Sequence, residues 1–429
     1  MFAQKLRTFK VILLIFYAAA NLFFFIRPVH AEEPHPPVLI SPNTYVFDDE
    51  TGQELLNDHG EERIYPASMV KMMTAILAIE HYPDTSHRIT LTRDMIGGFI
   101  ADGASIVGYL INDSPTILDL LYGTLLPSGA DCANSLAFAV SGNTEDFVKL
   151  MNQKAEELGM YNTHFMNPTG LHDDNQYSTC HDIGLLLSYC LKDPLFTEII
   201  GSREFTGTPV LSHAYGVRFS SAVYYSMSRG VVGKDIEGFI GGKSGYTIPA
   251  GRCLASAAQI NGMHVICVTA QSPQELGPIK DANTIYSWLR QNYHRENLLN
   301  EGDFLASIRC TGSEELKQID ILARDTVNYD LKDDETYEVI QDFTKKISAP
   351  AEKGKPLGAV IIHVNDQPIY EYHYLLDHDI QESNRSVLLR FIQENPRILL
   401  LYGVFLVLLL VFIPSFILAH LPRRRRRHR

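Results

Sequence analysis

The sequence predicts an α+β fold, because amphipathic helical segments and antiparallel hairpins occur in the same part of the chain. Successive segments between residues 116 and 158 have the apolar spacing of helices. Further along, two apolar runs flank Asn261-Gly262, which is a strong signal for a two-residue hairpin turn. Helices and antiparallel strands in this order are typical of a sheet flanked by helices.

The individual elements can be placed between about residues 40 and 293. A first hairpin is expected at Tyr45–Leu56, with its turn at residues 49–52. Helices are expected at Thr116–Leu126, Ala130–Ala139 and Thr144–Leu158, and the later hairpin joins Leu254–Ile260 to Met263–Ala270. We therefore interpret residues 32–293 as one domain.

The pattern changes near Leu298, where short strand-like segments separated by turns begin. Leu357–His363 is one of them, and Ile369–Leu376 is rich in Tyr and follows a Pro, as an edge strand does. We expect a small β-rich domain with its tether over residues 298–390, and polar residues 378–397 form the tether.

Both ends of the chain carry long apolar segments. Basic residues precede the apolar run Val11–Ile26, and Val29-His30-Ala31 offers a cleavage site, so residues 1–31 are predicted to be a signal peptide, with an uncleaved anchor as the alternative. Residues 398–419 contain no charge and are long enough to form a transmembrane helix. The Arg-rich tail, 420–429, should be cytoplasmic, which places the remainder on the extracytoplasmic side of a cell membrane in a single-pass arrangement.

Charge and cysteine content narrow the function classes. Between the two apolar ends the chain carries 27 basic and 50 acidic residues, a surface unsuited to binding nucleic acid. The six cysteines form no C-x-x-C pair, so a zinc knuckle is not indicated. They are either small core residues or partners in disulfides whose pairing the sequence does not define.

A hydroxyl and an amine lie three residues apart in Pro66-Ala-Ser-Met-Val-Lys-Met, where an apolar helix begins. Ser68 can serve as a helix cap and Lys71 can extend to water, which would be a purely structural pair. Alternatively, the two groups lie on one helical face, where an amine can activate a hydroxyl.

A second motif, Gly241-Gly-Lys-Ser-Gly245, invites a nucleotide-binding interpretation. A phosphate-binding loop requires a Gly at the position that Glu237 occupies, and an exported chain lies away from nucleotides. Ser-x-x-Lys, a second Ser motif and Lys-Ser/Thr-Gly, in that order, are instead the signature of penicillin-binding proteins and class A β-lactamases. Here the order is Ser68, Ser128 and Lys243.

The chain resembles the low-molecular-weight penicillin-binding proteins that act as serine D-alanyl-D-alanine carboxypeptidases. The stretches that carry the resemblance span about residues 40–290 and include YPASMVKMMTA, LLPSGADCANSLA, NPTGLHDDNQYSTCHDIGLL and GGKSGYTIPAGRCLASA. It implies a serine β-lactamase/transpeptidase-like catalytic domain, which removes the terminal D-alanine of peptidoglycan stem peptides through an acyl-enzyme and is inhibited by β-lactams. No metal and no cofactor are implied.

The resemblance also assigns roles to residues. The catalytic residues are Ser68 as nucleophile, Lys71 as a neutral base whose pKa is lowered by desolvation and by a nearby Lys243 cation, and Ser128 as proton relay. The substrate-binding residues are Lys243, Ser244, Gly245, Tyr246 and Thr247. The backbone amides of Ser68 and Tyr246 would form the oxyanion hole, and Thr247 would help to hold the terminal carboxylate. Lys280 and Arg252 are candidates for a second cation there.

One position departs from the family pattern. The middle motif is usually Ser-x-Asn, and Ala130 stands where the Asn is expected. A literal Ser-Gly-Asn occurs at residues 141–143, but it lies in a polar link between two helices, next to a capping signal. We therefore place the motif at Ser128 and expect the lost amide to affect rate and substrate geometry.

Two alternative functions remain open. A β-lactamase would use a Glu-x-x-Leu-Asn segment between the second and third motifs, whereas Glu296–Asn300 follows the third. A non-catalytic cell-wall or penicillin-binding sensor is kept open by Ala130. A third grouping, His172, Asp173, Asp174 and His181, resembles a metal cluster, but without a metal-protease motif we interpret it as a polar loop.

Overall fold

The computed structural model describes residues 35–99, 103–233 and 235–420. The predicted signal peptide, 1–31, and all of the basic tail except His420 lie outside these residues. The chain divides into two compact units. The first contains the described residues up to His294 together with Lys332–Asp334, and the second contains the other described residues from Arg295 onward.

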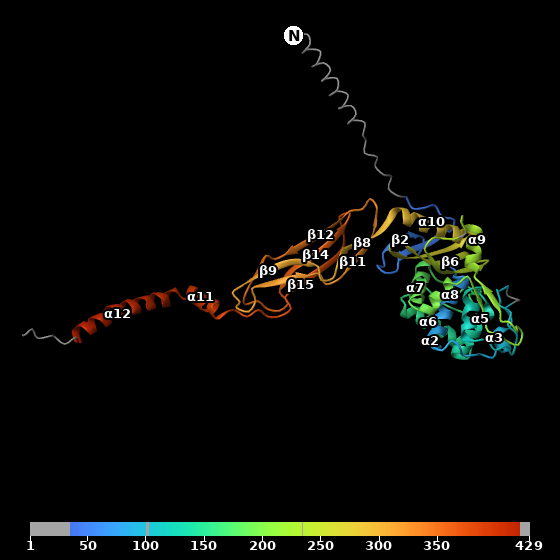
Figure 1. Cartoon of the computed structure of the whole chain (residues 1–429), viewed down its shortest axis with the longest axis horizontal. Coiled ribbons are helices and arrows are strands. Elements are labelled where there is room, and N and C mark those ends of the chain that lie inside the picture. The colour runs from blue at the N-terminus through green and yellow to red at the C-terminus, as the bar shows by residue number, and fades with distance from the viewer. Residues whose placement is uncertain (1–34, 100–102, 234, 421–429) are drawn as a thin grey trace, which may run out of the picture. The chain divides into compact units, whose positions relative to one another are not determined.

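The first unit is built on a five-stranded sheet with the order β2-β1-β7-β6-β5 (Figure 1). Every neighbouring pair in it is antiparallel. The strands are β1 (Asn43–Asp48), β2 (Glu54–Asp58), β5 (Phe239–Thr247), β6 (Gly251–Ile260) and β7 (Met263–Ser272). A small hairpin of β3 (Glu204–Thr206) and β4 (Arg218–Ser220) lies outside this sheet. The expected α+β class and antiparallel sheet are confirmed.

The hairpin expected at Asn261-Gly262 joins β6 to β7. Ile260 pairs with Met263, which leaves two residues for the turn. Asn261 and Gly262 both have positive φ, 47° and 86°, as this type of hairpin turn requires. The turn fixes the register of the two central strands, and β6 in turn positions β5 at the edge of the sheet.

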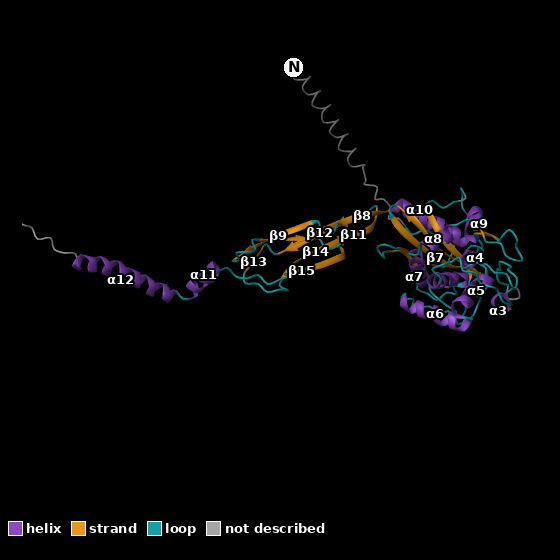
Figure 2. Ribbon diagram, turned by 60° about the horizontal axis from the view of Figure 1, so that its bottom comes forward, coloured by secondary structure: helices purple, strands orange, loops and turns teal. Residues whose placement is uncertain are grey.

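Helices cover both faces of this sheet (Figures 1 and 2). One face packs against α10 (Gly277–Asn292) and α9 (Ala222–Gly230) around Leu254, Val265 and Tyr286. The other face packs on the larger core, which contains Met72, Leu136 and Ile266. The elements on that side are η1 (Ala67–Val70), α2 (Lys71–His81), α3 (Arg93–Ile96), α4 (Ile117–Leu125), α5 (Ala130–Ser141), α6 (Thr144–Glu157), α7 (Cys180–Leu191) and α8 (Pro194–Gly201).

All six cysteines are buried free thiols. Burial raises the thiol pKa, most strongly for those in the first unit, so these side chains behave as small apolar core residues. The sequence left open whether the cysteines are core residues or disulfide partners, and in the structure they are core residues.

The second unit consists mainly of strands (Figure 2). They form small sheets with the orders β10-β9-β13, β11-β8 and β12-β14-β15, around a core that includes Ile308, Val360 and Ile362. The expected edge strand is β15, at one end of its sheet. The strands are β8 (Tyr293–Leu299), β9 (Phe304–Thr311), β10 (Gln318–Leu322), β11 (Val327–Lys332), β12 (Tyr337–Phe343), β13 (Lys346–Ser348), β14 (Pro356–Val364) and β15 (Gln367–Leu375).

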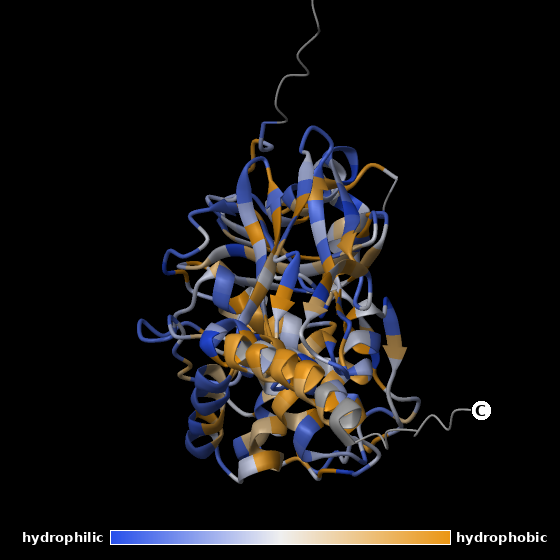
Figure 3. Cartoon of the chain, turned by 90° about the vertical axis from the view of Figure 1, so that its left-hand side faces the viewer, coloured by the Kyte–Doolittle hydropathy of each residue, from blue (hydrophilic) through white to orange (hydrophobic). Residues whose placement is uncertain are grey.

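Two helices follow the strands. The segment interpreted as a polar tether contains the helix α11 (Asn384–Glu394), capped by Ser383, whose hydroxyl accepts from the Ser386 amide. The sequence interpretation did not assign this helix, and the role of the segment as a tether remains a prediction. α12 (Pro396–His420) is hydrophobic along most of its length (Figure 3), and Pro396–Pro414 is long and apolar enough to cross a membrane.

Candidate active site

The nucleophile candidate lies on a tight turn at the head of a buried helix. Ser68 belongs to the 3-10 turn η1, and α2 begins at Lys71. Ala67, just before Ser68, has φ of 47°, a strained conformation for a residue with a side chain. The turn brings the Lys71 Nζ to 3.0 Å from the Ser68 Oγ, so an amine and a hydroxyl face each other.

The surroundings of Lys71 favour its neutral form. The side chain is 2% exposed, and burial lowers the pKa of the amine from 10.5 to about 7, although Asp131 acts in the opposite direction. Burial is thus the main cause of the low pKa of Lys71. The Nζ also donates to the carbonyl oxygen of Thr169 over 2.5 Å. An amine with a pKa near neutrality and one N–H engaged can present its lone pair to Ser68.

The Thr169 carbonyl is held by a loop that we call the carbonyl loop (residues 167–170). The Asn167 Oδ1 accepts from the Thr169 and Gly170 amides over 3.2 and 2.8 Å. Pro168 donates no backbone hydrogen bond, but its carbonyl accepts from the Thr74 hydroxyl of α2 over 2.7 Å. The loop is therefore tied to the helix that carries Lys71.

Gly170 brings this loop against the nucleophile turn. Its φ is 75°, and a Cβ there would lie 2.1 Å from the Ala67 carbonyl oxygen. Only glycine fits this position. The sequence interpretation included this segment in the resemblance but gave Thr169 and Gly170 no role. The Asn-Pro-x-Gly sequence at residues 167–170 is a turn signal, and it was the available indication in the sequence that a tight loop forms here.

Ser128 and Lys243 form a second hydroxyl–amine pair. The Lys243 Nζ donates to the Ser128 Oγ over 2.9 Å and to the Ser244 carbonyl over 2.8 Å. Ser128 has φ of 67° and lies two residues before the start of α5. Lys243 is 1% exposed, and burial, followed by repulsion from Lys71, holds the pKa of its amine well below the usual range. The repulsion between the two amines therefore lowers the pKa of Lys243, whereas the expected contribution of a Lys243 cation to the low pKa of Lys71 is not found.

Ala130, the departure from the family pattern, is buried as the first residue of α5. Its amide donates to the Ser105 carbonyl over 2.8 Å. Asp131 is also buried, and its carboxylate accepts from the Val107 and Gly108 amides, at 2.9 Å in each case. Asp131 is therefore engaged in holding the loop beside Ala130, rather than replacing the missing Asn amide.

A cavity of about 700 Å³ opens beside these groups and along the end of β5. Its lining includes Ser68, Lys71 and Ser128 together with Ser244, Gly245, Tyr246 and Thr247. A Cβ on Gly245 would lie 3.1 Å from the Ser68 amide nitrogen, so glycine lets β5 approach the nucleophile closely. Lys243 is the one predicted site residue that does not line the cavity. It reaches the cavity wall through its hydrogen bond to Ser128, which does line it.

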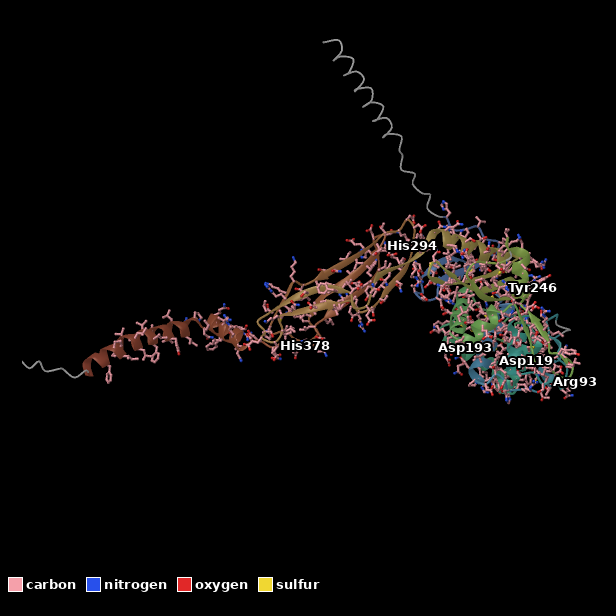
Figure 4. All side chains as sticks on the ribbon, viewed as in Figure 1. Arg93, Asp119, Asp193, Tyr246, His294 and His378 are labelled. Carbon is pink, nitrogen blue, oxygen red and sulfur yellow. The ribbon has the colours of Figure 1, made fainter. Side chains whose placement is uncertain are left out.

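The structure distinguishes between Arg252 and Lys280, the two candidate cations for binding a substrate carboxylate. Arg252 lies across from Tyr246 on β6, lines the cavity, and stacks its guanidinium 3.7 Å from the centre of the Tyr246 ring (Tyr246 is labelled in Figure 4). Lys280 is exposed on α10 and lies outside the cavity lining in the described part of the chain. The structure therefore favours Arg252.

Other groupings singled out in the sequence lie elsewhere. Ser141 ends α5, and Asn143 caps α6 by accepting from the Asp146 amide over 2.8 Å. The His181 Nδ1 lies 3.1 Å from a Glu61 oxygen, while His172 lies 3.2 Å from Asp174. No group of three or more potential metal ligands occurs within the described ranges. Glu296 belongs to strand β8 of the second unit.

The fold and the site together define a serine hydrolase that works by acyl transfer. A hydroxyl on a strained turn, a buried amine beside it, a second hydroxyl–amine pair and an edge strand converge on one cavity. These are the parts required for nucleophilic attack on a carbonyl and for proton transfer to a leaving amine.

Comparison with known proteins identifies the family. Residues 30–274 match the model of the D-alanyl-D-alanine carboxypeptidase family, and the chain belongs to this family. It is 26% identical over 339 residues to the D-alanyl-D-alanine carboxypeptidase DacF of Bacillus subtilis, covering 78% of this chain and 84% of that one. It is also 26% identical over 390 residues to the carboxypeptidase DacA of Haemophilus influenzae, covering 88% and 94%.

Solved structures agree on the fold. Penicillin binding protein 5 from Haemophilus influenzae superposes with a TM-score of 0.66 at 23% identity, covering 81% of this chain and 99% of that one. A Streptomyces DD-transpeptidase gives 0.55 at 26% identity, covering 59% and 98%. The chain is accordingly an enzyme, a serine-type D-alanyl-D-alanine carboxypeptidase of the penicillin-binding proteins. Neither a β-lactamase nor a non-catalytic sensor is favoured by these relatives.

Proposed function

We propose that this enzyme removes the terminal D-alanine of peptidoglycan stem peptides through an acyl-enzyme formed on Ser68. The observation that carries the proposal is the 3.0 Å contact between the Ser68 hydroxyl and an amine whose pKa is lowered to about 7. At neutral pH a substantial fraction of Lys71 is then free base, which is the form that can accept a proton.

In the acylation step, the Ser68 Oγ attacks the carbonyl carbon of the penultimate residue while its proton passes to Lys71. The developing oxyanion accepts hydrogen bonds from the Ser68 and Tyr246 backbone amides. The C–N bond then breaks. Lys71 passes the proton through Ser128 to the leaving nitrogen. The protonated nitrogen becomes the amine of free D-alanine, which departs.

In the deacylation step, water attacks the ester carbon and gives one proton to Lys71, and the Ser68 oxygen leaves and takes that proton back from Lys71, which regenerates both groups. The Lys243 contact to the Ser128 hydroxyl supports a relay through Ser128, because it orients that hydroxyl. Entry of a substrate carboxylate would favour the charged form of Lys243, since an opposite charge raises the pKa of an amine.

The terminal carboxylate of the substrate is assigned to Ser244, Thr247 and Arg252. Two of these offer hydroxyls on the cavity wall, and Arg252 supplies a guanidinium on the neighbouring strand. β-Lactams, which also pair an acylating carbonyl with a carboxylate, would enter the same site and acylate Ser68. No step requires a metal or another cofactor.

The test is D-alanine release from a peptide that ends in D-alanyl-D-alanine, measured for wild type and for Ser68→Ala. We expect release by wild type and none by the variant. Ser141→Ala is the matched control, because Ser141 lies at the end of α5, outside the cavity. D-alanine release that persists in Ser68→Ala would show that Ser68 is not the nucleophile.

We also propose that α12 anchors the enzyme in the cell membrane, with the catalytic domain (32–293) and the β-rich domain on the extracytoplasmic side. The length and apolar composition of α12 support anchoring, and the basic residues after it support the orientation. Protease added to intact protoplasts should digest both domains. Protection of the domains with an accessible Arg tail would reverse the orientation.

A further inference from the structure

A second cavity, of about 370 Å³, lies next to the active-site cavity in the first unit. Its walls come from the segment just before the nucleophile turn, Arg63–Tyr65, and from the turn between β5 and β6 with the end of β7, including Gln271. The acyl-transfer chemistry described above uses none of these side chains, so the cavity requires a separate explanation.

The two cavities are continuous at the end of β5. Ile248 and Pro249 line both of them. On the opposite side, the Tyr65 ring of the second cavity packs edge-on against His172 of the first, with ring centres 4.8 Å apart. Ile248 is 89% exposed, an unusual position for a large apolar side chain, and it stands on the ridge between the two spaces.

Each cavity contains an arginine stacked on a tyrosine. Arg252 stacks on Tyr246 in the first cavity, and in the second the Arg63 guanidinium carbon lies 3.3 Å from the centre of the Tyr177 ring. Neither arginine forms an ion pair with any residue in the described ranges. Stacking occupies the face of a guanidinium and leaves its N–H edge available for an anion. The protein has a net charge of −13, so two such arginines in adjoining cavities indicate local binding of anions.

The direction of a bound peptide follows from the active site, and this step rests on the proposed function. Ser68 attacks beside Gly245, and the terminal carboxylate is assigned to Ser244, Thr247 and Arg252. The cavity continues from Ser68 past His172 to Ile248, so the residues that precede the scissile bond can leave along this side. This path leads over the shared ridge into the second cavity.

We propose that the second cavity is a subsite for the acyl-donor part of the substrate, an extended peptide segment that carries a carboxylate upstream of its D-alanyl-D-alanine end. Arg63 binds that carboxylate, while Tyr65 and Ile248 contact the apolar parts of the same segment. The enzyme therefore has two anion sites, Arg252 for the carboxylate that leaves with D-alanine and Arg63 for one that stays with the acyl chain. Arg63 is a specificity residue and takes no part in bond breaking.

The experiment compares two peptides that end in D-alanyl-D-alanine and differ only in one upstream residue, which carries either a side-chain carboxylate or its amide. The carboxylate is placed at successive upstream positions. kcat/KM for D-alanine release is measured for wild type, Arg63→Gln, the charge-retaining Arg63→Lys, and Lys280→Gln. Lys280 is the matched control, since it is exposed in the same unit and lines neither cavity. Thermal melting establishes that each variant is folded.

We expect wild type to prefer the carboxylate peptide at one upstream position by about three- to tenfold, in line with a charge-assisted contact at an exposed site. The preference should disappear in Arg63→Gln, persist at least in part in Arg63→Lys, and remain intact in Lys280→Gln. Equal preference in wild type and Arg63→Gln, or no preference at any position in wild type, would overturn the subsite.

Calorimetry with the Ser68→Ala protein separates this inference from the proposed function. Binding of the same two peptides is measured without turnover, in Ser68→Ala and in the Ser68→Ala/Arg63→Gln double variant. A carboxylate preference that the second change removes supports the subsite even if wild type releases no D-alanine, an outcome that would defeat the proposed function alone. A preference unaffected by the second change overturns the subsite.

Discussion

The Nζ of Lys71 lies 2.5 Å from the carbonyl oxygen of Thr169, a residue 98 positions later in the chain. The carbonyl accepts one N–H of the amine, so the lone pair of the neutral form can be directed at the Ser68 hydroxyl, 3.0 Å away. The carbonyl loop thus orients the amine of Lys71, the proposed base, while burial lowers the pKa of this amine.

The low pKa of Lys71 predicts the acid limb of the pH–rate profile. Only the free base can accept the Ser68 proton, and the pKa is about 7, so kcat/KM for D-alanine release should fall as pH drops below about 7. The expected slope is about tenfold per pH unit. Steady-state rates between pH 5 and pH 9, with melting curves at each pH as control, test this. A rate that stays level down to pH 5 would contradict Lys71 as the base.

Substitution of Gly170 should displace the Thr169 carbonyl that orients Lys71, although Lys71 itself is unchanged. In Gly170→Ala the new Cβ would lie 2.1 Å from the Ala67 carbonyl, so the loop must shift by about 1 Å or more. A displacement of that size can cost about a hundredfold in rate. We expect D-alanine release to fall by about that factor.

The matched control for this change is Gly142→Ala. Gly142 also has positive φ, 79°, but a Cβ there would meet nothing within 4 Å. Both variants incur the backbone strain of about 1–2 kcal/mol for alanine in this conformation, so both should melt at lower temperature. Only Gly170→Ala should lose activity per folded molecule, and equal loss in the two would show that strain alone is responsible.

Labelling by a fluorescent penicillin should identify the nucleophile. Ser68→Ala should abolish the label, because among the serines in the described ranges the Lys71 amine contacts the Ser68 hydroxyl alone. Ser128→Ala should still label on Ser68 but about a hundredfold or more slowly, since a proton relay is lost. Ser141→Ala should label like wild type. Mass spectrometry of the labelled peptide decides the matter, and a label found on Ser128 would contradict the assignment.

Much of the fold was predictable because its signals are local. Asn261-Gly262 defines a hairpin through backbone conformations that few other residue pairs adopt. The helix α11 within the predicted tether has weaker local signals. Its apolar residues, such as Leu388 and Phe391, are exposed on α11, so a helix there depends on spacing and the Ser383 cap instead of a buried face.

The motif residues of the site were predictable from their order along the chain, but their supports were not. Ser68 and Lys71 are neighbours on one turn, whereas Thr169 reaches Lys71 through its backbone carbonyl, which any residue possesses. Side-chain identity therefore gave no indication of that contact. Similarly, the choice of Arg252 over Lys280 depends on three-dimensional placement, since Arg252 pairs with Tyr246 and lines the cavity, whereas Lys280 lies on α10 outside its lining.

The departure at Ala130 leads to the last prediction. An Asn there would donate and accept hydrogen bonds beside Lys71 and the substrate amide, and such a bond to a reacting group contributes about 1.5–3 kcal/mol. Its absence corresponds to a rate roughly 10- to 100-fold slower. Ala130 is buried, however, and its neighbour Asp131 already holds the Val107 and Gly108 amides. A larger side chain must displace that loop, at a cost of about 1–3 kcal/mol in the free energy of unfolding.

We therefore expect Ala130→Asn to melt at a lower temperature than wild type, yet to release D-alanine from a D-alanyl-D-alanine peptide at a rate per folded molecule that is raised, or at least not lowered. Ala133→Asn is the matched control, because it places the same amide at another buried position of α5, one turn further from the site. It should lower stability without any gain in rate. If Ala130→Asn melts normally and loses most of its activity, the site is built around the methyl group, and the interpretation of Ala130 as a missing contact is wrong.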